Sequence, residues 1–187
     1  MSCDKVAADG WGSARKLTLW VRHRNVVLWS LSRVLELPMG VLYDYFRAPD
    51  APTAAAVLER VGGPTTPDPD APLLDAVAAK GFEPTVMLGT LQSLLTGVSY
   101  DQLPKGELLA MEGEDGPWII QLSEELRDAL ADAQLSRLPA VAEQWVRTEE
   151  FWEQPPAAEV LPFLGEVTAL ARRARQAGER LYCWMCL

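Results

Sequence analysis

The last part of the chain carries the clearest hydrophobic pattern. Apolar residues recur every three or four positions from Val160 to Ala174, which predicts an amphipathic helix, and Gly178 is well placed to end it. The segment that follows, from Arg180 to Cys186, is almost continuously apolar. Such a run is typical of a strand that is buried on both faces, so we expect it in the centre of a sheet.

The middle of the chain predicts a helix, a hairpin and two further helices. Residues 84–96 place their leucines on one helical face, with a proline at the start and a glycine just past the end. Residues 108–111 and 118–122 are short apolar runs around an Asp-Gly turn, which predicts paired strands. Ser123 suits the N-cap of the next helix, and another helical stretch extends through Trp145.

The first third of the chain has a weaker pattern. Residues 1–25 predict a flexible N-terminal extension, whereas residues 26–31 are β-branched and aromatic and predict a buried strand. Apolar residues at helical spacing predict a helix over residues 38–46. Short helices are also expected over 53–61 and 73–79, separated by a loop rich in proline and glycine.

These elements predict one α+β domain over residues 26–187. At 187 residues the chain is long enough to bury a substantial core. We expect a small mixed or antiparallel sheet, built from the N-terminal strand, the central hairpin and the C-terminal strand, with several helices packed against it.

The charge of the chain narrows the class of partner. The net charge is −9, but residues 1–25 hold five basic side chains against two aspartates, so the rest of the chain carries −12. Binding to phosphate groups requires clustered Lys and Arg. We therefore expect neither nucleic acid nor an anionic membrane as a partner, and an acidic face suits a basic protein.

The composition also indicates a compartment. No apolar run approaches the roughly 18–20 residues that span a bilayer, and the first residues lack the pattern of a secretory signal. Three cysteines do not form a disulfide framework. Together these features predict a cytoplasmic protein.

The motif that most resembles chemistry is Cys183-Trp-Met-Cys186. Redox pairs with this spacing lie where a strand turns into a helix, because the helix N-terminus lowers the pKa of a thiol. Here the helix precedes the motif. In a strand, residues three apart point to opposite faces, so Cys183 and Cys186 would be buried structural residues that neither bridge each other nor share a metal ion. An exposed or processed tail would instead make them a thiol site.

Other catalytic and metal-binding arrangements find no support. His23 is the only histidine, and Arg22 and Arg24 flank it. A catalytic triad or a zinc site would depend on this residue alone. The acidic clusters at 112–115 and 149–153 are expected to be solvated faces rather than acid–base pairs. We therefore predict no catalytic residue, no cofactor site and no metal site.

Tryptophan is abundant, and it points to an interaction surface. The chain has seven tryptophans, most of which we expect in the core. Trp152 stands before a double proline at the end of a helix, so we predict that it is exposed. With Glu149, Glu150 and Glu153 it forms a candidate interaction surface.

Three segments share features with a known family. Leu94-Leu-Thr-Gly97 resembles a signature that ends a central helix, and Ser123-Glu-Glu-Leu126 resembles the start of an acidic-capped helix. Residues 163–187 are similar to a closing helix and strand. Over residues 26–187 the chain thus resembles the YfbM-like family of small bacterial proteins of unknown function. The resemblance implies no catalytic residue, because this family has no established active site.

Three classes of function stay open. The first, which we favour, is a non-enzymatic binding protein, of which an immunity-type protein that neutralises a basic partner is one form. The second is a carboxylate-dependent enzyme of unknown substrate, which needs two acidic residues in one deep pocket. The third is a protein whose C-terminal Cys-Trp-Met-Cys-Leu tail is modified, which requires a disordered tail.

Overall fold

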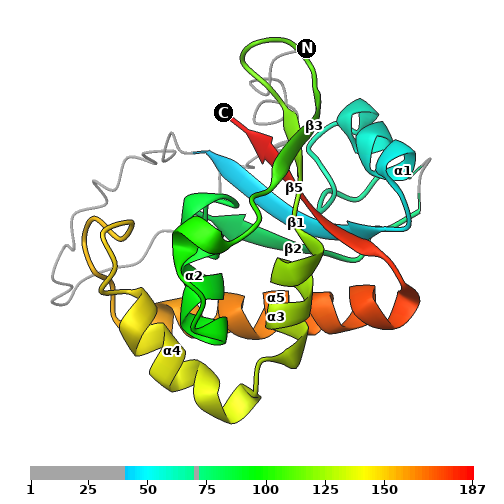
Figure 1. Cartoon of the computed structure of the whole chain (residues 1–187). Helices are drawn as coiled ribbons and strands as arrows, with labels where there is room; N and C mark the ends of the chain where they lie inside the picture. The colour runs from blue at the N-terminus through cyan, green and yellow to red at the C-terminus, as the bar shows by residue number, and fades with distance from the viewer. Residues whose placement is uncertain (1–40, 70–71) are drawn as a thin grey trace, which may run out of the picture.

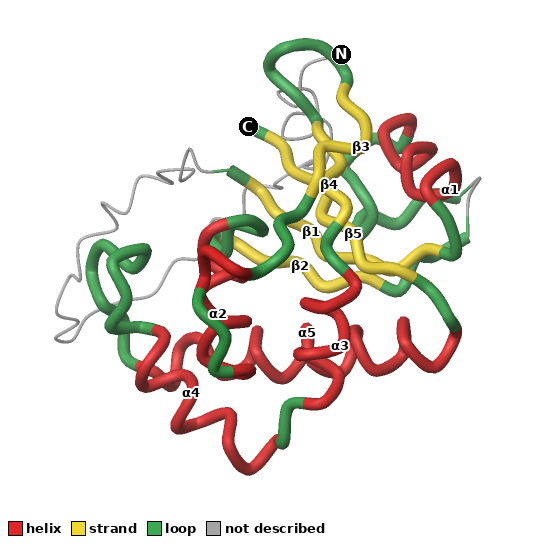
Figure 2. Tube along the Cα trace, viewed as in Figure 1, coloured by secondary structure: helices red, strands yellow, loops and turns green. Residues whose placement is uncertain are grey.

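The protein is an α+β domain with one antiparallel sheet (Figures 1 and 2). The structure, a computed structural model, describes residues 41–69 and 72–187. It confirms the predicted fold class, a single domain with helices packed on a sheet. The strand expected over 26–31 and the extension expected over 1–25 lie outside the described residues.

The sheet has the strand order β2-β1-β5-β4-β3. All neighbouring strands pair antiparallel. The strands are β1 (Leu42–Ala48), β2 (Ala76–Lys80), β3 (Glu107–Met111), β4 (Trp118–Gln121) and β5 (Arg180–Cys186). The helices are α1 (Ala51–Ala55), α2 (Val86–Thr96), α3 (Glu124–Asp132), α4 (Leu138–Trp145) and α5 (Ala157–Ala177). Short 3-10 turns cover η2 (Ala56–Glu59), η3 (Tyr100–Gln102) and η4 (Leu135–Arg137).

The secondary-structure predictions for the second half of the chain are confirmed. The Ser123 Oγ accepts a hydrogen bond from the Leu126 amide at 3.1 Å and so caps α3. Gly178 follows α5 with a φ of 69°, the left-handed conformation that ends many helices. Strands β3 and β4 form the expected hairpin. Strand β5 lies at the centre of the sheet, between β1 and β4.

The helix predicted over 38–46 is wrong, because residues 42–48 form β1. Tyr43 and Tyr45 face one core of the molecule, and Phe46 and Ala48 face the other. A strand that is buried on both faces has no polar side to reveal its period of two, so its apolar residues also fit a helical spacing.

The helix predicted over 73–79 is also wrong, because residues 76–80 form β2. Val77 and Ala79 are buried, whereas Ala78 and Lys80 are exposed, which is the alternation of a strand. Alanine favours helices in isolation. Pairing with β1 overrides that preference.

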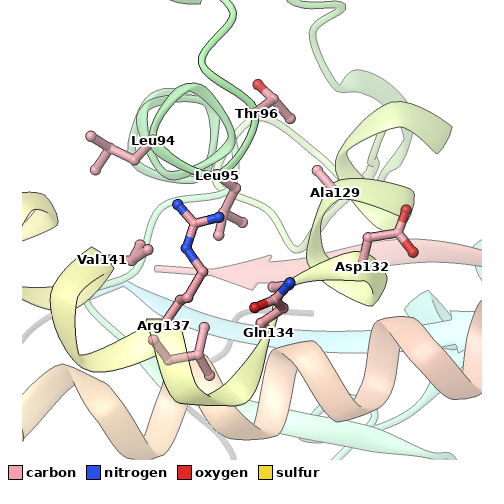
Figure 3. Close-up of a pocket in the computed structure, with 10 residues that line it drawn as sticks. Leu94, Leu95, Thr96, Ala129, Asp132, Gln134, Arg137 and Val141 are labelled. Carbon is pink, nitrogen blue, oxygen red and sulfur yellow. The ribbon is translucent and has the colours of Figure 1, made fainter.

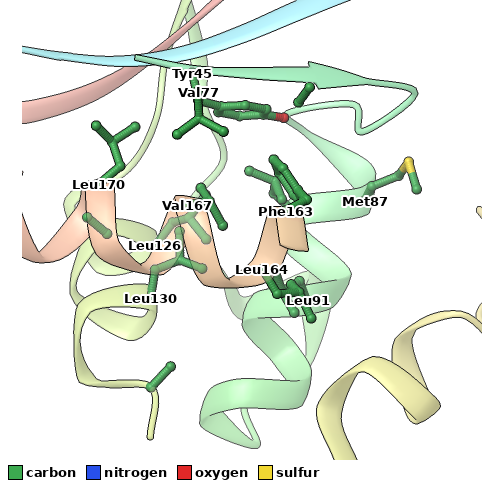
Figure 4. Packing of buried hydrophobic residues seen from close by; sticks show 14 of the residues in the cluster. Tyr45, Val77, Met87, Leu91, Leu126, Leu130, Phe163, Leu164, Val167 and Leu170 are labelled. Carbon is green, nitrogen blue, oxygen red and sulfur yellow. The ribbon is translucent and has the colours of Figure 1, made fainter. Parts of the chain in front are cut away.

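The sheet separates two hydrophobic clusters. On one face, α5 lies across the sheet, and α2, α3 and α4 pack around it (Figure 1). Figure 4 shows Tyr45 and Val77 of the sheet facing the side chains of α5, with residues of α2 and α3 beside them. The smaller cluster on the other face includes Phe46, Trp184 and residues of α1 and η2. No helix of the described part of the chain has both the length and the apolarity to cross a bilayer.

Candidate functional site

The loop between α4 and α5, residues 146–156, carries the most exposed large apolar side chain of the described residues. This Trp152 loop presents the Trp152 side chain with 96% of its surface exposed. The preceding residue, Phe151, is buried. The predicted exposure of Trp152 is therefore confirmed, and adjacent residues point in opposite directions.

Phe151 anchors the loop in a buried cluster of aromatic rings. Its ring meets the ring of Trp145 edge-on, with 5.0 Å between the centroids. Phe82 lies next to both rings and stacks on Phe163 of α5 at 4.2 Å. The Trp145 Nε1 donates a hydrogen bond to the carbonyl oxygen of Met87 at 3.1 Å. Edge-on and offset rings with a satisfied indole N–H make a stable support for the loop.

The backbone of the Trp152 loop is held by turns on both sides of Phe151. The Phe151 amide donates to the Thr148 carbonyl, and the Gln154 amide donates to the Phe151 carbonyl, each at 3.2 Å. Gln154 has a φ of 43°, a left-handed conformation that few residues other than glycine adopt. These contacts hold the tip of the loop, so Trp152 is presented by an ordered backbone.

The carboxylates of the loop divide into two groups. Glu149 and Glu153 are exposed, and neither has an ion-pair partner among the described residues. Glu150 turns inward, and its Oε1 accepts a hydrogen bond from the Thr90 hydroxyl at 2.9 Å. Burial alone would raise the pKa of Glu150, but nearby hydrogen-bond donors, Thr148 and Thr90 among them, outweigh burial and lower it. Glu150 thus ties the loop to α2 rather than extending the surface.

The charge around the loop is strongly negative. Residues 143–159 contain five glutamates and one arginine. That arginine, Arg147, pairs with Glu143 at 3.6 Å, and both side chains are largely exposed. Three candidate residues of the predicted surface, Trp152, Glu149 and Glu153, therefore lie together on an acidic, solvent-facing loop.

The two cysteines of the C-terminal motif are not brought together. Cys183 packs in the larger cluster on one face of the sheet, and Cys186 packs in the smaller cluster on the other. Cys183 is a buried free thiol, and burial raises its pKa well above the ordinary value. The predicted opposite orientation is confirmed.

The remaining candidates are the acidic tip of the β3–β4 hairpin and His23. Glu112, Glu114 and Asp115 are exposed at the tip of the β3–β4 hairpin, as expected. His23 lies outside the described residues. Within the described ranges, His, Cys, Asp and Glu side chains form no group of three that is able to hold a metal ion.

A second feature is a pocket between α2, α3 and α4 (Figure 3). This α2–α3–α4 pocket has a volume of about 200 Å³. Its lining combines apolar and polar side chains, with Asp132 as its single carboxylate, and comprises Leu94, Leu95, Thr96, Ala129, Asp132, Ala133, Gln134, Arg137, Leu138 and Val141. One carboxylate does not provide the paired acids that a carboxylate-dependent hydrolase requires.

Sequence reasoning missed two parts of this arrangement. Phe151 packs against Phe82, which is about seventy positions away in the sequence. No pattern of neighbouring residues indicates this contact, so the burial of Phe151 was not predicted. The pocket joins the ends of three helices, so no single segment encodes it.

Comparison of the chain with protein-family models, with curated proteins and with solved structures gave no match. The resemblance to the YfbM-like family therefore stays a prediction.

Proposed function

We propose that this protein is a non-enzymatic binding protein of the cytoplasm, and that the Trp152 loop docks on a basic protein partner. An immunity-type protein that neutralises a cationic toxin is one form of this function. The observation that carries the proposal is the 96% exposure of Trp152 on a loop anchored by the buried Phe151.

An exposed tryptophan on an ordered loop is suited to binding. Leaving a large apolar ring in water is unfavourable by about 25 cal/mol for each Å² of apolar surface, and docking removes that surface from water. Tryptophan is among the residues that most often dominate binding energy at protein interfaces. Because the loop is already held by Phe151 and its turns, docking orders few additional groups.

The charge of the loop supports a basic partner. Glu149 and Glu153 flank Trp152 without ion-pair partners among the described residues. Complementary charge accelerates association and excludes acidic competitors. Exposed carboxylates around an exposed aromatic ring thus suit a surface of the partner that is rich in Lys and Arg.

The other two classes of function have less support. The α2–α3–α4 pocket holds one carboxylate, and Asp44, which is buried, lies on the sheet and accepts hydrogen bonds from Thr65. Residues 180–186 form the central strand β5, so a modifying enzyme would have to open the sheet to reach them. Both observations favour the binding hypothesis.

Photo-crosslinking in the native host tests the proposal directly. A photoreactive amino acid at position 152 should trap one basic protein, identified by mass spectrometry, because this position would lie inside the interface. The matched control carries the same amino acid at Leu135, an exposed apolar residue in η4. Equal trapping from both positions, or the trapping of acidic proteins only, would refute the proposal.

Binding measurements with the purified partner then separate the two parts of the surface. We expect Trp152→Ala to weaken binding by about tenfold to a hundredfold, as for an interface hot spot. The pair Glu149→Gln and Glu153→Gln should slow association and reduce its dependence on salt. Glu114→Gln with Asp115→Asn removes the same charge at the hairpin tip, away from the loop in Figure 1, and should leave association nearly unchanged.

A further inference from the structure

We propose that the α2–α3–α4 pocket binds a small monocarboxylate with a short apolar body, and that Arg137 pairs with its carboxylate. The proposal does not rest on the proposed function, because the pocket and the Trp152 loop have no lining residue in common. It assigns a ligand class to the pocket from the chemistry of the residues that line it.

Arg137 is the only arginine of the described residues whose guanidinium makes no hydrogen bond or ion pair with another described residue. Each of the others binds a carboxylate or a carbonyl oxygen. In a chain with a net charge of −9, carboxylates are abundant, yet none in the described part of the chain pairs with Arg137. Arg137 lines the pocket, and Figure 3 shows its side chain reaching toward α2, with the guanidinium beside Leu95. A guanidinium in this position has its donors available for a carboxylate that enters from solvent.

The apolar walls of the pocket are suited to an apolar body. Leucine, alanine and valine side chains from three helices form them, including Leu95, Ala129 and Val141. The one acidic side chain of the lining, Asp132, is paired with Arg175 at 2.6 Å, so its charge is already compensated. Gln134 also lines the pocket, and its amide N–H₂ group is a second donor to an anion.

The frame of the pocket is fixed before any ligand binds. The guanidinium of Arg172 on α5 donates hydrogen bonds to the carbonyl oxygens of Ala131 and Ala133, which cap the end of α3. The pocket wall at Ala129 and Ala133 is therefore anchored to the longest helix of the molecule. A ligand would enter a preformed cavity, as is usual for small-molecule sites.

The volume limits the size of the ligand. A water molecule takes about 30 Å³ in the liquid, and a carbon with its hydrogens takes a similar volume. The 200 Å³ of the pocket thus accommodates a body of about five to seven carbons. Straight-chain monocarboxylates of this length, and benzoate, are suitable probes.

Calorimetric titration of the full chain with straight-chain monocarboxylates, from acetate to decanoate, tests the site. Affinity should rise by about fourfold for each added methylene up to about five to seven carbons, since each buried methylene contributes a constant increment, and should then stop rising. Hexanoate should bind at least tenfold more tightly than 1-hexanol, which has the same chain but no charge to pair with Arg137. No heat of binding up to about 10 mM hexanoate, or equal binding of 1-hexanol, would overturn the proposal.

Three variants localise the binding. Arg137→Gln should weaken hexanoate at least tenfold and leave 1-hexanol unchanged. Ala129→Leu should abolish the binding of both probes by filling the pocket, and its thermal unfolding is recorded to verify that it folds. Arg147→Gln, which removes an exposed arginine outside the pocket, is the matched control and should bind hexanoate like the native chain. Wild-type affinity in Arg137→Gln would refute the assignment.

Discussion

Phe151 and Trp152 are adjacent in the sequence but have opposite surroundings, and the contrast defines the loop. Phe151 contacts Trp145 and Phe82 inside the larger cluster, whereas Trp152 is exposed to solvent. Packing against buried neighbours stabilises a fold, and a side chain in water does not. Phe151 therefore supports the loop, and Trp152 is the side chain that the loop presents to solvent.

The first prediction separates these roles by stability. Phe151→Ala should lower the free energy of unfolding by about 3 kcal/mol, because it leaves a cavity among aromatic rings. Trp152→Ala should change it by less than about 0.5 kcal/mol. Urea denaturation followed by fluorescence measures both. Comparable losses from the two substitutions would show that Trp152 is packed and would argue against its role as a docking residue.

The second prediction concerns the reactivity of Cys183. Its thiol is buried in the centre of the sheet, and burial raises its pKa well above the ordinary value. Because the thiolate is the reactive form, iodoacetamide should not label Cys183 in the native protein but should label it in guanidinium chloride. Peptide mass mapping distinguishes Cys183 from the other cysteines. Rapid labelling of the native protein would mean that β5 opens readily, which would revive the hypothesis of a modified tail.

At the scale of the element, local sequence signals predicted the helices and strands whose ends are marked by particular residues, such as a capping or a terminating residue. Ser123 and Gly178 mark helix ends through a hydroxyl acceptor and a left-handed backbone. Strands β1 and β2 have no such marks, and their identity comes from pairing with β5 and with each other. The exposed Trp152 was predictable from its place before a double proline. The pocket was not, because Leu95, Ala129 and Val141 meet only after three helices have packed.

The third prediction tests a helix cap that the sequence analysis did not identify. The side chain of Glu83 accepts hydrogen bonds from the backbone amides of Thr85, Val86 and Met87 and so caps α2. Glu83→Ala leaves these donors unpaired, and we expect a loss of about 1 kcal/mol in the free energy of unfolding. Glu83→Gln retains one acceptor and should recover part of that loss. Equal losses in both variants would indicate that the charge, rather than the hydrogen bonds, stabilises the helix.

At the scale of the whole molecule, one ion network joins the sheet to the longest helix. Asp75, just before β2, accepts two hydrogen bonds from Arg173 of α5 and one from Arg47 of β1, each at 2.7 Å. Arg47 also pairs with Glu179, which precedes β5. Hydrogen bonds from Arg173, and then from Arg47, hold the pKa of Asp75 at about 2, below its usual value of 3.8. The network thus links three separate segments of the chain near one edge of the sheet.

The depressed pKa of Asp75 makes part of the stability depend on pH. Well above pH 3.8 the carboxylate is ionised in both the folded and the unfolded chain, so the contribution of the network is complete. As the pH falls from 3.8 towards 2, the unfolded chain takes up its proton first, and the contribution is lost. Solvent reaches these side chains, so we expect the network to contribute about 1 kcal/mol to the free energy of unfolding rather than the full linkage energy.

Asp75→Asn should therefore be about 1 kcal/mol less stable than the native chain at pH 7 and no less stable at pH 2, as measured by urea denaturation. Asp132→Asn, which breaks the more exposed pair with Arg175, is the control and should cost less than about 0.5 kcal/mol at pH 7. If Asp75→Asn lost the same stability at both pH values, Asp75 would act through packing or neutral hydrogen bonds, and the acid sensitivity of the fold would have to come from other carboxylates of this strongly acidic chain.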